Sequence, residues 1–253
     1  MIPKVIHYCW FGKAKKSELI SQCILTWKKH LPDFELKEWN EENSIIDCDF
    51  ALKAFRKKQW AFVSDYIRLT VLYKYGGIYL DTDMFLVKPL HDLLQHSCFL
   101  GKQDERVVSA GIIGSVPGHP FIKRCIDEYK TKRFDEHRLV NLAIPELITR
   151  VYGSHLAVNT EVIIYSPEYF YPYSTYDHLV DKDFLKYITP NSYSVHLWNS
   201  SWFSKKEAAA LCLQRKEYVK FFSLMFQYML ENPSFFVKIP GLILRHVKRS
   251  AIS

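Results

Sequence analysis

Two aspartates, Asp81 and Asp83, follow a short apolar segment, residues 78–80, and are separated by a single residue. In an extended strand, residues i and i+2 project from the same face, so we expect these two carboxylates side by side. Carboxylates this close repel each other and are costly to bury without a compensating charge. A divalent cation with oxygen ligands is the usual compensation; the alternative is an ordinary surface turn or helix cap.

A second pair of charged residues, Asp65 and Arg68, lies three residues apart in the apolar segment 60–75. At this spacing two residues share one face of a helix. If it were exposed, such an ion pair would contribute little to stability. Because the segment is apolar on nearly every side, we expect the pair to be half-buried and to face a cleft.

The same segment explains how the carboxylates are positioned. Its apolar residues predict a largely buried helix, which Gly76 and Gly77 end in a left-handed conformation. The apolar strand at residues 78–80 starts immediately afterwards. Open α/β sheets bind their ligands beyond the carboxyl ends of their strands, which is where Asp81 and Asp83 lie.

The rest of the chain alternates between strands and helices, which favours an α/β sheet with crossover helices. Ser17 is the predicted N-cap of the first helix. Residues 167–177, rich in aromatic residues and proline, predict a packed loop. Strands are predicted at residues 4–10, 34–39, 78–80, 98–101, 110–114, 162–165 and 194–198, and helices at residues 17–29, 50–58, 60–75, 120–130 and 207–231.

Composition and charge limit the class of protein. The 253 residues are 48% apolar and 15% aromatic, enough for the core of one large domain, with or without a smaller appendage. The net charge is +7, and residues 205–253 carry nine Lys and Arg against three Glu, so the body is close to neutral. This argues against a protein that coats nucleic acid. A basic, apolar tail instead predicts binding of that tail to an anionic surface. We expect a catalytic domain over residues 1–204 and a helical, basic and apolar tail over residues 205–253.

The chain also carries indications of its cellular location. Its six cysteines are scattered, with no CxxC pair, which predicts reduced thiols rather than disulfides or a zinc site. No secretory signal is visible at the start, and no apolar run approaches the ~20 residues needed to span a bilayer. We therefore expect a cytoplasmic protein.

Four segments together carry a resemblance to a known family. Residues 64–69 (SDYIRL) and 72–83 (LYKYGGIYLDTD) resemble the signature of the DXD-sugar-binding glycosyltransferases. In particular they resemble glycosyltransferase family 32, related to the clostridial toxin glucosyltransferases and the yeast initiation mannosyltransferases. The opening 2–12 (IPKVIHYCWFG) is similar to that family's start, and residues 196–202 (HLWNSSW) are similar to its closing element.

The resemblance implies a GT-A-type fold: a mixed, mostly parallel sheet flanked by helices, followed here by a helical C-terminal segment. It also implies a nucleotide diphosphate sugar donor, uridine-linked, a Mn²⁺ or Mg²⁺ ion on the diphosphate, and transfer with retention of configuration. In such a site Asp83 is the direct metal ligand, and Asp81 contacts the ribose and the metal's water shell. Asp65 and Arg68 match positions that hold the hydroxyls of the donor sugar.

Further residues receive roles from the same resemblance. Trp10 would stack on the nucleobase, although it could equally be a core residue at a strand end. His196 would complete the metal shell or bind a phosphate, and its alternative is a structural histidine. The remaining expected donor-binding residues line the sugar (Ser109, Ala110, Gly111) or contact the diphosphate and its leaving oxygen (Asn199, Ser200, Trp202).

One departure from the family pattern concerns the acceptor side. Family members often carry Gly-Pro before a helix where this chain has Ile144-Pro145, so the local acceptor geometry stays open. No nucleophile for a double displacement is apparent, and the family implies a front-face mechanism, in which attack and departure occur on one side of the sugar.

We therefore expect a metal-dependent, retaining glycosyltransferase that moves a hexose or N-acetylhexosamine to a glycan acceptor. That acceptor would belong to capsular, exo- or lipopolysaccharide synthesis and would be free or lipid-linked. Residues 235–249 would touch the inner face of the membrane, and no nucleic acid is expected as a partner. The alternatives are a toxin-like, protein-directed glucosyltransferase and a non-catalytic module that binds sugar nucleotides or glycans. A metal-dependent nuclease or phosphatase would need more metal ligands near the two aspartates.

Overall fold

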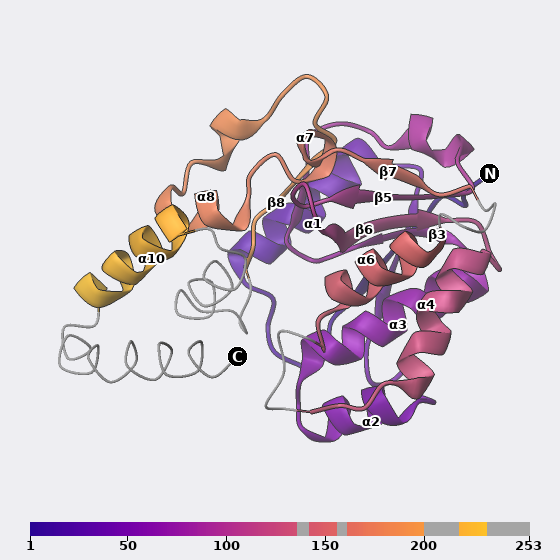
Figure 1. Cartoon of the computed structure of the whole chain (residues 1–253). Helices are drawn as coiled ribbons and strands as arrows, with labels where there is room; N and C mark the ends of the chain where they lie inside the picture. Colours follow the sequence, from indigo (N-terminus) through magenta and orange to yellow (C-terminus); the bar gives the residue numbers. More distant parts are fainter. Residues whose placement is uncertain (136–141, 156–160, 200–217, 232–253) are drawn as a thin grey trace. The chain divides into compact units, whose positions relative to one another are not determined.

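The computed structural model describes residues 1–135, 142–155, 161–199 and 218–231 (Figure 1). The chain divides into two compact units. The first consists of Met1–Ser174 and Asp183–Trp198, and it contains both sheets. The second consists of Thr175–Lys182 and Asn199–Ser253, of whose later part the structure describes the helix α10, Tyr218–Glu231.

The main sheet has the strand order β2-β1-β3-β6-β5-β7, so β3 lies in the interior of the sheet between β1 and β6. Three of its five strand pairings are parallel, and β6 runs antiparallel to both of its neighbours. This confirms the mixed, mostly parallel α/β class predicted from the sequence. The strands are β1 (Val5–Cys9), β2 (Glu35–Trp39), β3 (Gly77–Leu80), β5 (Cys98–Lys102), β6 (Val108–Ser115) and β7 (Ile163–Tyr165).

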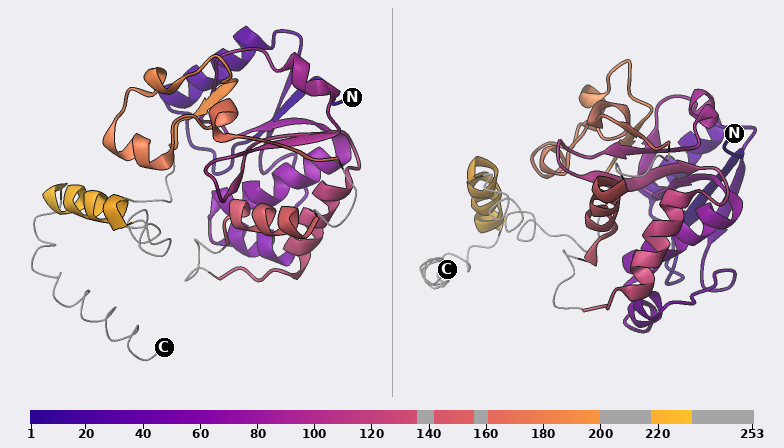
Figure 2. Two further views of the ribbon diagram at one scale, coloured as in Figure 1. Left: turned by 45° about the horizontal axis from the view of Figure 1, so that its top comes forward. Right: turned by 45° about the vertical axis from the view of Figure 1, so that its right-hand side comes forward.

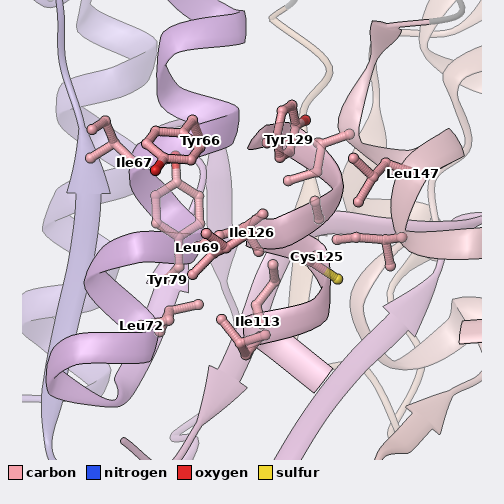
Figure 3. Packing of buried hydrophobic residues seen from close by; sticks show 14 of the residues in the cluster. Tyr66, Ile67, Leu69, Leu72, Tyr79, Ile113, Cys125, Ile126, Tyr129 and Leu147 are labelled. Atoms are coloured by element: carbon pink, nitrogen blue, oxygen red, sulfur yellow. The ribbon is translucent and has the colours of Figure 1, made fainter. Parts of the chain in front are cut away.

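Helices cover both faces of this sheet (Figures 1 and 2). Side chains of α2, α3, α4 and α6 share one hydrophobic core with β3, β5 and β6, part of which Figure 3 shows. Side chains of α1 share the other core with the opposite face of the same strands. The helices of the first unit are α1 (Glu18–His30), α2 (Asp49–Arg56), α3 (Trp60–Tyr75), α4 (Pro120–Thr131), α6 (Ile144–His155) and α7 (Pro167–Phe170), with 3-10 turns at His91–Gln95 and Phe184–Tyr187.

The junction between α3 and β3 has the geometry that its two glycines predict. Gly76 and Gly77 have φ angles of 65° and 100°, in the region that side chains disfavour. The Gly76 N–H donates to the Leu72 carbonyl at 2.8 Å, which closes the last turn of α3. The chain therefore passes from the buried helix into the buried strand without a loop, as expected.

A second, two-stranded sheet is formed by β4 (Met84–Leu86) and β8 (Ser194–His196), which pair antiparallel. The sequence predicted β8 as a late strand but did not predict β4. Helix α1 holds β4 in place, because the Trp27 ring N–H donates to the Met84 carbonyl at 2.7 Å. The predicted cap of α1 is confirmed, since the Ser17 hydroxyl accepts from the Ile20 N–H at 3.3 Å.

Two further expectations need comment. The prediction of a packed loop over residues 167–177 is wrong in part, because α7 and α8 (Thr175–Val180) form there; prolines and serines that look like loop signals can also begin short helices. Helix α6 was not predicted. Helix α10 falls within the predicted helix at 207–231, and residues 207–217 of that prediction lie outside the described residues.

Candidate active site

The two aspartates lie on a turn that connects the two sheets. The Asp81 N–H donates to the Gly111 carbonyl at 2.8 Å, which extends the β3–β6 pairing by one residue. The Met84 N–H then donates to the Asp81 carbonyl at 2.9 Å, and β4 begins. The expectation that the two carboxylates project from one face of an extended strand is wrong, because the chain turns here to pair β4 with β8. Asp81 is anchored to the main sheet, and Asp83 leads into the small one.

Arg68 links the predicted helical pair to the first aspartate. Its guanidinium lies 3.0 Å from Asp65 Oδ1 and 3.1 Å from Asp81 Oδ1. It also donates to the Ala110 carbonyl at 2.9 Å and lies over the Tyr79 ring, 4.5 Å from its centroid. The structure thus brings these predicted residues together from α3, the end of β3 and β6.

Asp65 and Arg68 are more deeply buried than predicted, with 6% and 5% of each residue exposed. Burial raises the pKa of Asp65 to about 6, against the opposing charge of Arg68. For Arg68, burial is outweighed by Asp81, Tyr79 and Asp65, which hold the guanidinium pKa well above its usual value. Arg68 therefore stays charged, and Asp65 depends on it to remain ionised near neutral pH.

Asp83 forms a second pair with His196. The His196 Nε2 lies 3.0 Å from Asp83 Oδ1, and both side chains are nearly buried. The pairing of β4 with β8 brings the two residues together, because Met84 is opposite His196 and the Leu197 N–H donates to the Asp83 carbonyl at 3.0 Å. Burial lowers the pKa of His196, but the charge of Asp83 outweighs it and the net shift is upward.

The second ring nitrogen of His196, Nδ1, is buried and has no hydrogen-bond partner among the described residues. A buried polar atom in this condition is costly unless a ligand or water satisfies it. Asp81, Asp83 and this nitrogen offer the oxygen and imidazole donors that suit Mn²⁺ or Mg²⁺. Within the described residues, no three His, Cys, Asp or Glu side chains are gathered closely enough to hold a cation by themselves. The donor set fits a cation that completes its shell with phosphate oxygens and water, as Mg²⁺ commonly does.

The three small residues expected around the donor sugar lie in β6, opposite the aspartates. Ser109, Ala110 and Gly111 are all buried there. A Cβ added to Gly111 would lie 3.3 Å from Asp81 Oδ2, so a larger residue here would crowd that carboxylate. The Ala110 carbonyl accepts a hydrogen bond from Arg68, and the Gly111 carbonyl accepts one from the Asp81 N–H.

The structure describes Trp10, but only residues 196–199 of the closing motif 196–202. Trp10 follows β1, which is parallel to and paired with β3, so it lies at the same edge of the sheet as Asp81. Its ring N–H donates to the Ala14 carbonyl at 2.7 Å, and Lys16 Nζ lies 5.2 Å from its ring centroid. Asn199 is exposed and belongs to the second unit. Ser200 and Trp202 lie outside the described residues.

Two residues of the site were not predicted from the sequence. The Tyr79 hydroxyl donates to Asp81 Oδ1 at 3.1 Å, and its ring lies under Arg68. Tyr79 lies in β3, and Asp81 continues the pairing of that strand two residues later, a spacing that could have indicated the contact. Tyr171 packs against His196 with ring centroids 5.8 Å apart, and its position in an aromatic-rich segment gave no local signal.

Comparison with known proteins identifies two matching families. Residues 17–100 match the family described as "Glycosyltransferase sugar-binding region containing DXD motif". Residues 114–214 match the family described as "Alpha 1,4-glycosyltransferase conserved region". The first match contains α3, β3 and both aspartates.

Individual relatives agree with these families. The human alpha-1,4-N-acetylglucosaminyltransferase is 30% identical over 189 residues, which are 65% of this chain and 51% of that protein. Mannosyl phosphorylinositol ceramide synthase CSH1 of Saccharomyces cerevisiae is 28% identical, over 81% of this chain and 51% of that protein. The human lactosylceramide 4-alpha-galactosyltransferase is 27% identical, over 54% of this chain and 41% of that protein. The chain thus spans about half the length of these relatives.

Among solved structures, the PaToxG glycosyltransferase is similar, with 19% sequence identity, a TM-score of 0.48, and coverage of 62% of this chain and 69% of that one. The family matches run in order along the chain, and the DXD segment 81–83 lies where the geometry gathers the charged residues. The chain is thus similar, over residues 17–100, to the sugar-binding region of glycosyltransferases that contain a DXD motif and, over residues 114–214, to the conserved region of alpha 1,4-glycosyltransferases.

Proposed function

We propose that this protein transfers a hexose or N-acetylhexosamine from a nucleotide diphosphate sugar, uridine-linked, to a glycan acceptor. The single observation that carries this proposal is the position of Arg68, held between Asp65 and Asp81 beside the DXD turn. A buried pair of Arg and carboxylate suits a site that binds sugar hydroxyls. In a closed site, a ligand that lacks the matching hydroxyl leaves these polar groups without a partner, which is costly.

Each charged group has a role in this reaction. Asp83 and Asp81 would hold a Mn²⁺ or Mg²⁺ ion, with His196 Nδ1 as a further donor to the ion or to a phosphate. When bound, the ion neutralises charge on the departing diphosphate. Asp65 and Arg68, both buried, would bind and orient the sugar.

The transfer would retain the configuration of the sugar by a front-face route. Asp65 and Asp81, two of the carboxylates assigned to the donor site, are both engaged by Arg68. A carboxylate committed to such an ion pair is a weak nucleophile, which is consistent with attack by the acceptor on the same side as the departing diphosphate. Proton magnetic resonance of the fresh product distinguishes retention from inversion.

The acceptor is proposed from the relatives. The names of two of the three contain a ceramide lipid, mannosyl phosphorylinositol ceramide in one and lactosylceramide in the other. A lipid-linked glycan is therefore the acceptor class that we favour here, and a growing capsular, exo- or lipopolysaccharide chain would present the same chemistry.

The C-terminal part is proposed to meet an anionic membrane surface from the cytoplasmic side. Helix α10 exposes Tyr218, Phe222 and Phe226, which are four residues apart and so share a face, with 53%, 67% and 57% of each residue exposed. Residues 205–253 also carry most of the net positive charge. Aromatic side chains with nearby basic residues favour the membrane interface. The segment 235–249, expected to make this contact, lies outside the described residues, and no described helix is long and apolar enough to cross a bilayer.

The test of the proposed function is a panel of nucleotide diphosphate sugars, each incubated with the full chain with and without Mn²⁺. We expect release of the nucleotide from one or two donors, dependent on the metal, and faster release when a glycolipid acceptor is added. Binding without release would instead favour a sugar-nucleotide-binding module. Transfer to a protein but not to a glycolipid would favour the toxin-like alternative.

A further inference from the structure

The candidate site consists of two hydrogen-bonded groups that belong to different sheets. Arg68 gathers Asp65 and Asp81 at the end of the main sheet. His196 holds Asp83 on the small sheet. A donor that is bound by both groups at once requires them to keep a fixed relationship, because small misplacements in a site can cost large factors in rate.

Tyr171 contacts β6, the strand that holds the first group, and His196 of the second group. Its hydroxyl accepts a hydrogen bond from the Ile112 N–H at 3.0 Å, next to the residues of β6 that hold Arg68 and Asp81. Its ring meets the His196 ring edge-on, with centroids 5.8 Å apart and an interplanar angle of 77°. One side chain thus touches β6 at one end and the partner of Asp83 at the other.

Gly111 shows how close this hydroxyl comes to the first aspartate. A Cβ added to Gly111 would lie 3.1 Å from the Tyr171 hydroxyl oxygen and 3.3 Å from Asp81 Oδ2. The hydroxyl and the carboxylate therefore both border the space that a side chain at residue 111 would occupy.

The position of Tyr171 itself is well fixed. The residue is 1% exposed, and its backbone N–H donates to the Pro167 carbonyl at 2.7 Å at the end of α7. Burial also raises the pKa of Tyr171 above its usual value, so the phenol is neutral at physiological pH. A neutral, rigid side chain of this kind can space two charged groups without competing for the metal.

We propose that Tyr171 is a positioning residue that holds the Arg68–Asp81 group and the Asp83–His196 group in register for the donor. Nothing in the sequence pattern assigns it to the site, and it acts through β6 and His196 rather than by touching the reacting atoms. The proposal rests on the proposed function, because the alignment of the two groups matters only if both bind one donor.

The first test replaces Tyr171 by Phe, which keeps the ring against His196 and removes the hydroxyl. We expect kcat for nucleotide release to fall about tenfold or more, with the KM for the donor within about threefold, since binding groups remain and their alignment is lost. Tyr173→Phe is the matched control: Tyr173 is also 1% exposed, two residues along the same segment, and its ring packs on Phe184 and Tyr187. Equal kcat values for the two variants, or a change in KM alone, would overturn the proposal.

The second test is a double-mutant cycle between Gly111→Ala and Tyr171→Phe. The added methyl group crowds the Tyr171 hydroxyl, so Gly111→Ala should cost less, in both the midpoint of urea unfolding and kcat, when that hydroxyl is absent. Additive losses in unfolding would show that the contact is not made, and this result does not require turnover. Coupled unfolding with additive losses in kcat would make the contact structural only and would also overturn the proposal. Absence of turnover in the wild type would instead refute the proposed function on which this inference rests.

Discussion

The indole N–H of Trp39 donates a hydrogen bond to Nδ1 of His7 across 3.0 Å, between the neighbouring strands β2 and β1. Because Nδ1 accepts, the ring proton is on Nε2, which donates to the Gly76 carbonyl at 2.8 Å. His7 therefore ties β2, β1 and the end of α3 together as a neutral imidazole, just before β3 carries the chain to the aspartates.

This arrangement predicts a pH dependence of stability. Burial lowers the pKa of His7 to about 4, from about 6.5 when unfolded. Between these values the unfolded chain binds more protons, so the free energy of unfolding falls as the pH drops from 6.5 to 4, by up to about 3 kcal/mol. Urea denaturation at pH 7, 5.5 and 4.5 measures it. His7→Gln should be less stable at pH 7 but show a flatter profile, and parallel profiles for the two proteins would contradict this origin.

Removing one member of the buried pair in α3 should separate stability from activity. Arg68→Met leaves Asp65 buried without its cation, which should cost about 3–5 kcal/mol of unfolding free energy. Replacing both, as Asp65→Leu with Arg68→Met, should recover most of that stability and none of the nucleotide release. Recovery of activity in the double variant would show that the pair has only a structural role.

Asp83→Ala is expected to abolish metal-dependent nucleotide release, by about a thousandfold or more, while the chain stays folded. Its partner His196 remains held by β8 and keeps its ring contact with Tyr171. Far-ultraviolet circular dichroism of the variant measures whether the chain stays folded, and nucleotide release during a Mn²⁺ titration measures the metal-dependent activity. Asp127→Ala is the control, since Asp127 pairs with Lys123 on an exposed face of α4. Near-normal release from the Asp83 variant would refute the metal assignment.

The glycine at the start of β3 should tolerate no side chain. In Gly77→Ala the Cβ would lie 2.7 Å from the Val5 carbonyl oxygen and 3.0 Å from His7 Nε2, in addition to the strain of a φ of 100°. We expect a loss of about 3 kcal/mol or more. Gly118→Ala is matched, because Gly118 also has a positive φ, 71°, but its Cβ would meet nothing within 4 Å. It should lose only about 1 kcal/mol, and equal losses in urea denaturation would contradict the steric account.

The membrane proposal is tested by flotation with vesicles. The full chain should float with vesicles that contain phosphatidylglycerol and much less with pure phosphatidylcholine. Phe222→Glu with Phe226→Glu should reduce the bound fraction several-fold, and removal of residues 235–253 should reduce it further. Leu25→Glu, at an exposed apolar position of α1, is the control. Equal binding by all four proteins would remove the membrane from the proposal.

The features that the sequence predicted well depend on contacts between near neighbours. Helix α3 was predicted over residues 60–75, as observed, because its apolar pattern and its two terminal glycines are local. The Asp65–Arg68 pair follows from helical spacing alone. The alternation of strands and helices was enough for the fold class.

The features that it missed depend on distant parts of the chain. Asp81 and Asp83 were expected in an extended strand, and the turn between them exists because β4 pairs with β8, more than a hundred residues later. The contact of Arg68 with Asp81 joins two elements whose packing no local pattern specifies. Tyr171 reaches β6 from about sixty residues away, and composition predicted only that its surroundings are packed.

The turn at residues 81–83 has a consequence for how the proposed site can vary. Each aspartate is anchored to a different sheet, and only one residue lies between them. The separation of the two carboxylates thus depends on how the small sheet packs on α1, where the Trp27 ring N–H donates to the Met84 carbonyl. Substitutions at Trp27 would therefore be expected to change the separation of the two carboxylates, and with it the size of the group that the proposed site accepts, while the DXD motif itself stays unchanged. Two homologues with identical signatures need not share a donor.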